Sequence, residues 1–135
     1  MTLVLDASAI IDLLVRSDRG EQVRDLLIER ADEDLATVAH LDAEVFSGLA
    51  RTHRAGNIAA DEVAGLLRRL GDLAVARLPI TGELLDAAWA LCDNIAACDA
   101  LYVAAARALP GELVTTDDRL ARAAPDIVAK TADPA

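Results

Sequence analysis

The sequence predicts a single α/β domain, a three-layer α/β/α sandwich in which helices cover both faces of a central, mostly parallel sheet of four to five strands. Two observations carry this prediction. Short apolar runs alternate along the 135 residues with longer segments whose apolar residues recur at helical spacing. The composition is 54% hydrophobic but only 2% aromatic, so Leu, Val, Ile and Ala must fill the core, which favours helices packed on a sheet.

The predicted strands are short and apolar. The first run ends directly at Asp6, and the fourth ends at Asp117. Because these runs lack the alternation of a half-exposed strand, both of their faces are expected to be covered, as in a parallel sheet. The predicted strands are residues 3–5, 35–39, 74–78 and 113–116, with 127–129 as an optional fifth strand.

Helices are predicted between the strands from apolar spacing and from residues that start or stop helices. The segment 42–55 begins with an aspartate cap and ends before Gly56. The segment 99–109 is rich in Ala and is ended by Pro110. The predicted helices are residues 9–15, 21–30, 42–55, 61–70, 81–94 and 99–109.

The chain is expected to be one domain, residues 1–131, followed by a short acidic tail, 132–135. Cys92 and Cys98 are too few for a disulfide framework and lack zinc-binding spacing, so both are expected to be reduced. No apolar run approaches the roughly 18 residues of a membrane span, and the first residues lack a signal-peptide pattern. We therefore expect a soluble, cytoplasmic protein.

Charge and missing motifs narrow the function further. The net charge of -10 argues against a protein that coats nucleic acid through a broad basic surface, but it leaves room for a nuclease with a local site. Neither GxSxG nor GxxxxGK[ST] is present, and Cys98 has no evident His partner. His40 and His53 stand apart and are interpreted as structural or surface residues.

Three aspartates fall where a parallel sheet binds ligands. Asp6 follows the first strand, Asp117 follows the fourth, and Asp99 opens a predicted helix. Ligands of open parallel sheets bind beyond the carboxyl ends of the strands, and a helix start can face the same crevice. Each acid alone has an ordinary explanation, since aspartate is also a common helix cap. Together they predict convergence from distant parts of the sequence.

Glu44 differs from these aspartates because it lies inside a predicted helix. Its neighbours Val45 and Gly48 belong to the face that is expected to pack inward. An inward carboxylate needs a hydrogen-bond donor or a cation, since an unpaired buried charge is costly. The alternative is that this long side chain reaches the surface. Asp12 and Asp93 are interpreted as polar positions on helix surfaces.

Four acids in one crevice would repel one another, and the economical remedy is a hard divalent cation with oxygen ligands, Mg²⁺ or Mn²⁺. Such an ion lowers the pKa of a bound water and stabilises charge on a phosphoryl oxygen, so phosphodiester hydrolysis is the predicted chemistry. Ser8 could bind a metal water or phosphate, or simply cap the next helix. The candidates for orienting ligands and water are Ser8, Thr115, Thr116 and Asp118.

Four blocks of the sequence, in this order, resemble the PIN domain family and within it the VapC toxins. They are LVLDASAIIDLL at the start, AEVFSGLA in the third helix, CDALYVAAARAL, and LVTTDDRLARA near the end. The resemblance covers essentially the whole chain, and the combined order and spacing are more specific than any single acid. It implies a PIN-like α/β/α sandwich.

By this resemblance Asp6, Glu44, Asp99 and Asp117 match the family's acidic quartet. Asp6 and Asp99 would bind Mg²⁺ directly, with Mn²⁺ as a substitute, and Glu44 and Asp117 would act through water. The implied activity is endoribonuclease cleavage, commonly of a structured transfer or ribosomal RNA, which inhibits translation and growth.

Two departures from the family pattern stand beside these acids. Cys98 precedes Asp99 where the family often has an aromatic residue. A second acid, Asp118, follows Asp117, which leaves the fourth member of the quartet open between the two. Asp117 fits the family's T-x-D spacing and the end of the strand better.

The resemblance also implies partners. A VapB-like antitoxin would place its C-terminal segment across the acidic site, and the chain would form a homodimer, with a heterotetramer or larger assembly when the antitoxin is bound. Local basic residues would guide RNA despite the acidic total. The candidates are Arg51, Arg54, Arg68, Arg69, Arg119 and Arg122.

Other classes remain as alternatives. A catalytically inactive PIN-like binding module would keep the acids as a metal-binding or Arg-binding pocket without cutting RNA. A haloacid-dehalogenase-like phosphatase would need a second aspartate where Ser8 stands. A phosphoacceptor receiver domain would use a late lysine, which Lys130 matches only loosely, and an early acidic pair that the sequence lacks.

Overall fold

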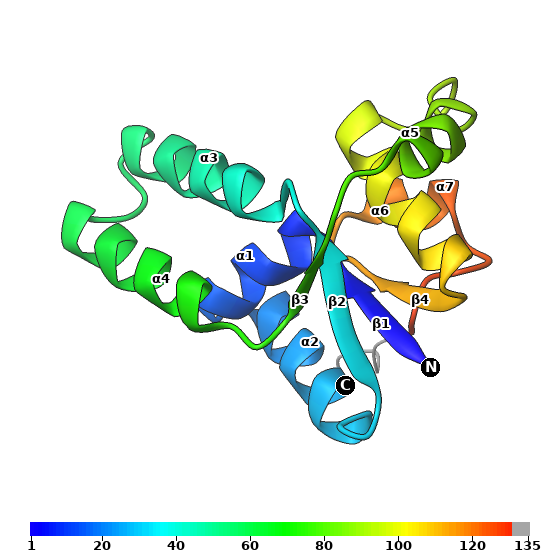
Figure 1. The fold of residues 1–135 in the computed structure, drawn as a ribbon. Coiled ribbons are helices and arrows are strands. Elements are labelled where there is room, and N and C mark those ends of the chain that lie inside the picture. Colours follow the sequence, from blue (N-terminus) through cyan, green and yellow to red (C-terminus); the bar gives the residue numbers. More distant parts are fainter. Residues whose placement is uncertain (131–135) are drawn as a thin grey trace.

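A computed structural model describes residues 1–130 and has a four-stranded sheet at its centre (Figure 1). The strands lie in the order β3-β2-β1-β4, and every neighbouring pair is parallel. They are β1 Thr2–Leu5, β2 Asp34–Val38, β3 Ala76–Leu78 and β4 Gly111–Val114. The predicted sheet is confirmed, and its named strands are all parallel. The tail predicted at 132–135 lies outside the described residues.

Helices cover both faces of this sheet, as the predicted three-layer sandwich requires. In the described part of the chain α1 to α4 lie on one side and α5 to α7 on the other (Figure 1). They are α1 Ala7–Val15, α2 Asp18–Glu29, α3 Leu41–Arg54, α4 Ala60–Asp72, α5 Gly82–Trp89, α6 Ala97–Ala108 and α7 Asp118–Ala123. Across residues 1–130, every helix is too short or too polar to cross a bilayer.

The core forms where the two helical layers meet the strands. Leu3, Val4 and Leu5 of β1 are all fully buried, because helices cover the strand from both sides. Aliphatic residues fill nearly all of this core, as the composition predicts. Tyr102 of α6 is the large exception, with none of its surface exposed. A buried tyrosine needs a partner for its hydroxyl, and that partner lies in the site described below.

Three elements differ from the sequence expectations. The optional strand 127–129 is reduced to one bridge, in which Val128 pairs with Leu113 beside β4. The helix expected over 81–94 ends at Trp89, and turns follow it, in which the amides of Leu91, Cys92 and Asn94 bond to carbonyls three positions back. Helix α7 was not expected, since it has only 6 residues and depends on a cap from Asp117.

The carboxyl ends of β1 and β4 bring two distant segments together. Leu5 pairs with Val114 at the last register position. The Asp6 amide then donates to the Val114 carbonyl at 3.1 Å. The chain segments that begin at Asp6 and Thr115 therefore leave the sheet side by side, at the edge where parallel sheets bind their ligands.

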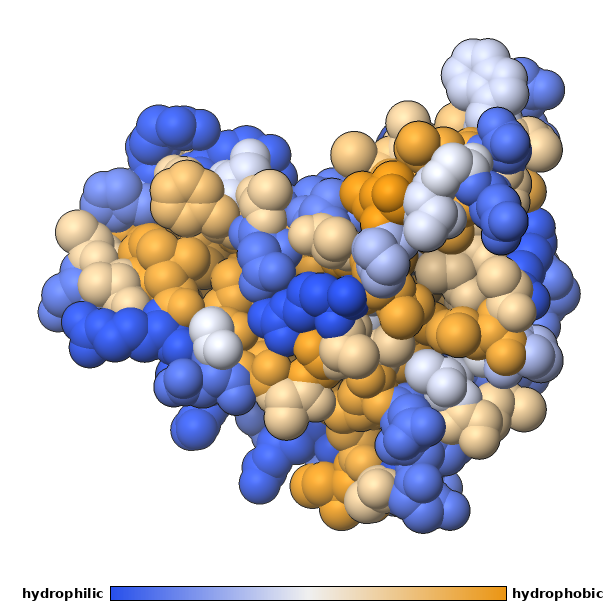
Figure 2. Space-filling model, in the orientation of Figure 1, coloured by the Kyte–Doolittle hydropathy of each residue, from blue (hydrophilic) through white to orange (hydrophobic). Residues whose placement is uncertain are grey.

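Figure 2 shows where apolar side chains reach the surface. On this face they gather between α3 and α4 and over the region in which β3 passes α5 and α6, with charged side chains around them. A shallow apolar groove lies in this region, lined by Leu78, Pro79, Leu84, Ala104, Ala108 and Leu109.

Candidate active site

Asp6 is the first residue after β1, and only 2% of it is exposed. Its Oδ1 accepts hydrogen bonds from the Ser8 hydroxyl at 2.7 Å and the Ala9 amide at 2.9 Å. Its Oδ2 accepts a hydrogen bond from the Thr115 hydroxyl at 2.5 Å. Burial raises the pKa of Asp6 to about 6, since hydrogen bonds from Thr115, Ala9 and Ser8 only partly offset the loss of water. The nearby charge of Asp99 raises it further.

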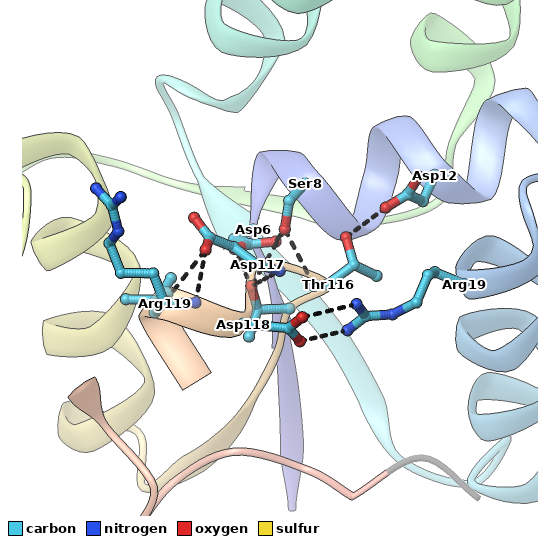
Figure 3. A network of polar contacts seen from close by, with 10 residues as sticks. Asp6, Ser8, Asp12, Arg19, Thr116, Asp117, Asp118 and Arg119 are labelled. Carbon is cyan, nitrogen blue, oxygen red and sulfur yellow. Dashed lines mark hydrogen bonds and ion pairs between the residues drawn. The ribbon is translucent and has the colours of Figure 1, made fainter. Parts of the chain in front are cut away.

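A network of hydroxyl groups ties the ends of β1 and β4 together (Figure 3). The Ser8 Oγ lies 3.1 Å from the Thr115 Oγ1 and accepts a hydrogen bond from the Thr116 amide at 3.1 Å. The Thr116 hydroxyl donates to Asp12 of α1. Asp12 is therefore half-buried and bonded, which corrects its interpretation as a plain helix-surface position. Ser8 supports Asp6 directly, while Asp6 itself caps α1.

Asp117 lies at the end of the segment that follows β4. Its Oδ1 accepts hydrogen bonds from the amides of Arg119 at 2.9 Å and Leu120 at 3.3 Å, so it is the N-cap of α7. Its own amide donates to the Thr115 hydroxyl at 3.1 Å. Asp117 and Asp99 line the same cleft, which has a volume of about 570 Å³. The cleft is in the size range of ligand pockets.

Asp118, the other candidate for the fourth acid, has a different partner. Its carboxylate accepts hydrogen bonds from both terminal nitrogens of Arg19 on α2, at 3.0 Å and 3.3 Å (Figure 3). This guanidinium lowers the pKa of Asp118. Asp118 lines the same cleft as Asp99 and Asp117, but only the charge of Asp117 raises the pKa of Asp99.

Asp99 lies in the first turn of α6 and is half-buried. Burial raises its pKa, and the charges of Asp117 and Glu44 raise it further, while His40 lowers it. Because Asp99 also acts on the pKa of Asp6, it is electrostatically coupled to each of the other three acids. The four acids predicted from the sequence therefore lie at one edge of the sheet, near enough to Asp99 for their charges to act on one another through it.

Glu44 has the hydrogen-bond donor that an inward carboxylate requires. The hydroxyl of Tyr102 donates to its Oε1 at 2.6 Å. The Nε2 of His40, one helical turn earlier, lies 3.4 Å from the same oxygen. The rings of His40 and Tyr102 stack with centroids 4.5 Å apart. Burial and the bond to Glu44 raise the pKa of Tyr102, so its hydroxyl stays protonated and donates.

Tyr102 and His40 are residues of this site that the sequence reasoning missed. Helical spacing was the signal that could have found them. Tyr102 is three positions after Asp99 on α6, and His40 is four positions before Glu44, so each pair shares one helix face.

A hard divalent cation fits the oxygen donors of this cluster. The protein side chains alone leave the charges of Asp6 and Asp99 uncompensated, as their raised pKa values show, and a cation between them would reverse both shifts. Within residues 1–130, no three of the four acids have carboxylate oxygens that all lie within 4.8 Å of one another. A small ion such as Mg²⁺ would therefore keep water between itself and some of these acids.

A tighter group of potential ligands lies beside the acids but suits a metal less well. The ligand atoms of His40, Glu44 and Cys98 lie within 4.8 Å of one another. However, the His40 Nε2 already lies at hydrogen-bond distance, 3.0 Å, from the Cys98 carbonyl oxygen. Burial raises the pKa of the Cys98 thiol, with Glu44 and Asp99 adding to the effect, and this disfavours the thiolate that would bind a metal.

The site and fold together define a protein class with a parallel sheet and an acidic edge that could hold a metal ion. Sequence comparison identifies the family: the PIN domain matches residues 3–125. The chain belongs to the PIN domain family, as its sequence blocks indicated.

Within this family the chain is similar to proteins named VapC. Ribonuclease VapC3 of Mycobacterium tuberculosis is 44% identical over 124 residues, which cover 91% of this chain and 88% of that protein. Ribonuclease VapC1 of the same species is 36% identical, over 89% of each chain. Ribonuclease VapC3 of Pyrobaculum aerophilum is 35% identical over 95% of this chain and 98% of that protein.

Proposed function

We propose that the chain is a metal-dependent endoribonuclease of the VapC toxin type, with Mg²⁺ as its ion and Mn²⁺ as a substitute. The observation that carries the proposal is the meeting of four acids at the carboxyl edge of the sheet, with Asp6 buried and its pKa raised to about 6. The relatives named ribonucleases support the choice of RNA as substrate.

Each acid has a distinct task in this proposal. Asp6 and Asp99 bind the cation directly, because their pKa values are the ones that burial and neighbouring charge raise. Glu44 and Asp117 act through water, held in place by Tyr102 and by the start of α7. The bound ion would activate water and offset charge on the phosphoryl group during in-line displacement.

The hydroxyl groups around Asp6 have a positioning role. Ser8 and Thr115 donate to different oxygens of Asp6, so the orientation of its carboxylate is fixed. Thr116 holds the turn after β4 through Asp12. Such preorganised supports matter because ligand orientation controls metal affinity. Asp118 stabilises the junction with α2 through Arg19 and has no catalytic task.

The expected partners follow from this function. The substrate is a structured transfer or ribosomal RNA, its cleavage inhibits translation and growth, and the site of action is the cytoplasm. A VapB-like antitoxin is expected to cover the acids with its C-terminal segment. The expected homodimer could use the apolar groove between β3, α5 and α6, since exposed apolar surface favours association.

The test is cleavage of total bacterial RNA by the purified protein, with and without Mg²⁺ or Mn²⁺. Wild type should give discrete fragments only with metal, and Asp6→Ala and Asp99→Ala should give none. Asp25→Ala is the matched control, because it removes a carboxylate from an exposed position of α2. It should cleave like wild type.

The alternative is a PIN-like binding module without catalysis. It predicts that well-folded, antitoxin-free wild type leaves RNA intact at every metal concentration. The same protein would still show metal binding that depends on Asp6 and Asp99. That combination of results would replace the nuclease proposal.

A further inference from the structure

We propose that Arg119 and Arg122 of α7 form a subsite for a phosphate of the RNA chain, next to the phosphate that is cut. This inference rests on the proposed ribonuclease function and deepens it. It selects two of the basic residues that the sequence alone leaves undistinguished, and it assigns them one ligand chemistry, a backbone phosphodiester.

The two arginines share a wall of the cleft with the acids. Arg119 and Arg122 line the same cleft as Asp99 and Asp117. They are three positions apart on α7, so their side chains project from one helix face. The Arg119 amide donates to the Asp117 carboxylate at 2.9 Å. The bond that fixes Asp117 therefore also fixes the start of the helix that carries both guanidinium groups.

Neither guanidinium group is held in an ion pair, although the charge of Arg122 contributes to the lowered pKa of Asp118 in the same cleft. Five other arginines form ion pairs with carboxylates, namely Arg19, Arg24, Arg30, Arg77 and Arg107. Arg119 and Arg122 have no ion pair or side-chain hydrogen bond to any of residues 1–130, and both are exposed. Figure 3 shows Arg119 extending away from Asp118, whose carboxylate is taken by Arg19.

The other candidate arginines lie elsewhere. Arg51 and Arg54 are in the last turn of α3, and Arg68 and Arg69 are near the end of α4. None of these four lines the cleft that contains Asp99 and Asp117. The expectation that all six arginines guide RNA is therefore narrowed to two residues at the proposed site of cleavage.

Electrostatics explains why such a subsite is needed. The chain carries a net charge of -10, and the cluster of acids repels the RNA backbone until a cation neutralises it. A divalent ion would offset the negative charge of the phosphate that is cut, but the acidic protein would still repel the neighbouring phosphates. Guanidinium groups bind phosphate through two parallel hydrogen bonds, which also fix its orientation. Arg119 and Arg122 are thus positioning residues for the substrate.

The experiment compares Arg119→Gln/Arg122→Gln with Arg16→Gln/Arg69→Gln. The control removes the same charge from two exposed arginines of a pocket between α1, α2 and α4, which contains none of the four acids of the proposed site. Two readouts are taken over a series of salt concentrations: cleavage of total bacterial RNA with Mg²⁺, and anisotropy of a short fluorescein-labelled single-stranded RNA without metal. Circular dichroism establishes that each variant is folded.

The cleft variant should bind and cleave RNA at least about tenfold more weakly than wild type, mainly through KM. Its slope of log affinity against log salt should be smaller by about 1.4, since each lost single-strand phosphate contact removes about 0.7. The control should keep the wild-type slope. Arg119→Lys/Arg122→Lys should keep most of the slope but lose part of the affinity, because lysine keeps the charge and lacks the fork.

Equal losses in the cleft variant and the control would overturn the inference, since they would reflect total charge. So would a cleft variant that cleaves RNA normally but resists inhibition by antitoxin, since the arginines would then serve a protein partner. Failure of the ribonuclease proposal can be told apart from failure of this inference, because wild type itself would then not cleave RNA. The binding assay still decides the inference in that case.

Discussion

The two halves of the acidic cluster are held in different ways. The strand-end half consists of Asp6, Ser8, Thr115, Thr116 and Asp117, and the helix half of His40, Glu44, Asp99 and Tyr102. In the strand-end half the carboxylates accept hydrogen bonds from backbone amides and nearby hydroxyls, and both aspartates cap helices. In the helix half, Glu44 accepts its hydrogen bond from a tyrosine 58 positions away in the sequence.

This difference separates an acid that is held partly by its own sequence neighbours from an acid whose hydrogen-bond donor comes from another element. Asp6 accepts hydrogen bonds from Ser8 and Ala9 within three positions, and from Thr115, which is 109 positions away but is brought beside Asp6 by the pairing of β1 and β4. Glu44 depends on where α3 and α6 begin at the carboxyl edge, because Tyr102 comes from a helix on the other side of the sheet. The strand-end half should therefore tolerate changes in helix packing, and the helix half should be sensitive to them.

Removal of the Asp6 charge should have the largest effect on activity. Mutation of a residue that supports a metal ligand lowers metal affinity or activity by about 10- to 100-fold. Asp6→Asn removes the charge of a proposed direct ligand, so it should lower activity by more than about 100-fold. Cleavage of total bacterial RNA with Mg²⁺ measures this loss. Retention of more than a tenth of the wild-type rate would remove Asp6 from the proposed set of direct ligands.

The same change should stabilise the metal-free protein near neutral pH. Burial raises the pKa of Asp6 from 3.8 to about 6, so the folded state holds its proton more tightly than the unfolded state. Stability from this group is fully present below about pH 4 and is lost as pH rises through about 6. Asp6→Asn should thus raise the free energy of unfolding at pH 7 by up to about 3 kcal/mol. Urea unfolding should show little gain at pH 4.

Tyr102→Phe tests the helix half and should cost less. The variant keeps the buried ring and removes only the hydroxyl that donates to Glu44. Activity should fall about tenfold, because Glu44 loses the group that orients it. The free energy of unfolding should fall by only about 1 kcal/mol, since Glu44 is partly exposed and water can replace the donor. Unchanged cleavage would show that Glu44 is positioned without Tyr102.

The same contrast explains what could be predicted from the sequence. The acids at strand ends were predictable because alternation of strands and helices predicts a parallel sheet, and such sheets bind ligands at their carboxyl edge. The spacing of Val45 and Gly48 also indicated that Glu44 faces inward. Its donor could not be predicted, since Tyr102 and Glu44 lie on helices that cover opposite faces of the sheet and meet only at its carboxyl edge.

The missed elements have local causes that apolar spacing does not report. Helix α7 has only 6 residues and begins with a side-chain cap from Asp117, so it has no long apolar period. The segment around Val128 pairs through a single bridge, because only Leu113 lies in register with it. The choice between Asp117 and Asp118 likewise depended on Arg19, which lies 99 positions from Asp118.

Thr115→Val should have a smaller effect on activity than Tyr102→Phe but a clear effect on stability. The Thr115 hydroxyl donates to Asp6 and accepts from the Asp117 amide, so its loss leaves two groups short of a partner. The pKa of Asp6 should rise further, because that hydrogen bond lowers it. Unfolding in urea should show a loss of about 1 to 3 kcal/mol. Thr52→Val is the control, since that hydroxyl bonds only within α3.

Asp118→Asn should have the smallest effect, although Asp118 is the neighbour of Asp117. Its carboxylate pairs with Arg19, and both side chains are largely exposed, so solvent screens their attraction. RNA cleavage with Mg²⁺ should stay within about twofold of wild type, as expected for loss of a surface ion pair. A loss as large as that of Asp117→Asn would place Asp118 in the strand-end half of the site. Adjacent acids would then act together, and the division between catalytic Asp117 and structural Asp118 would be wrong.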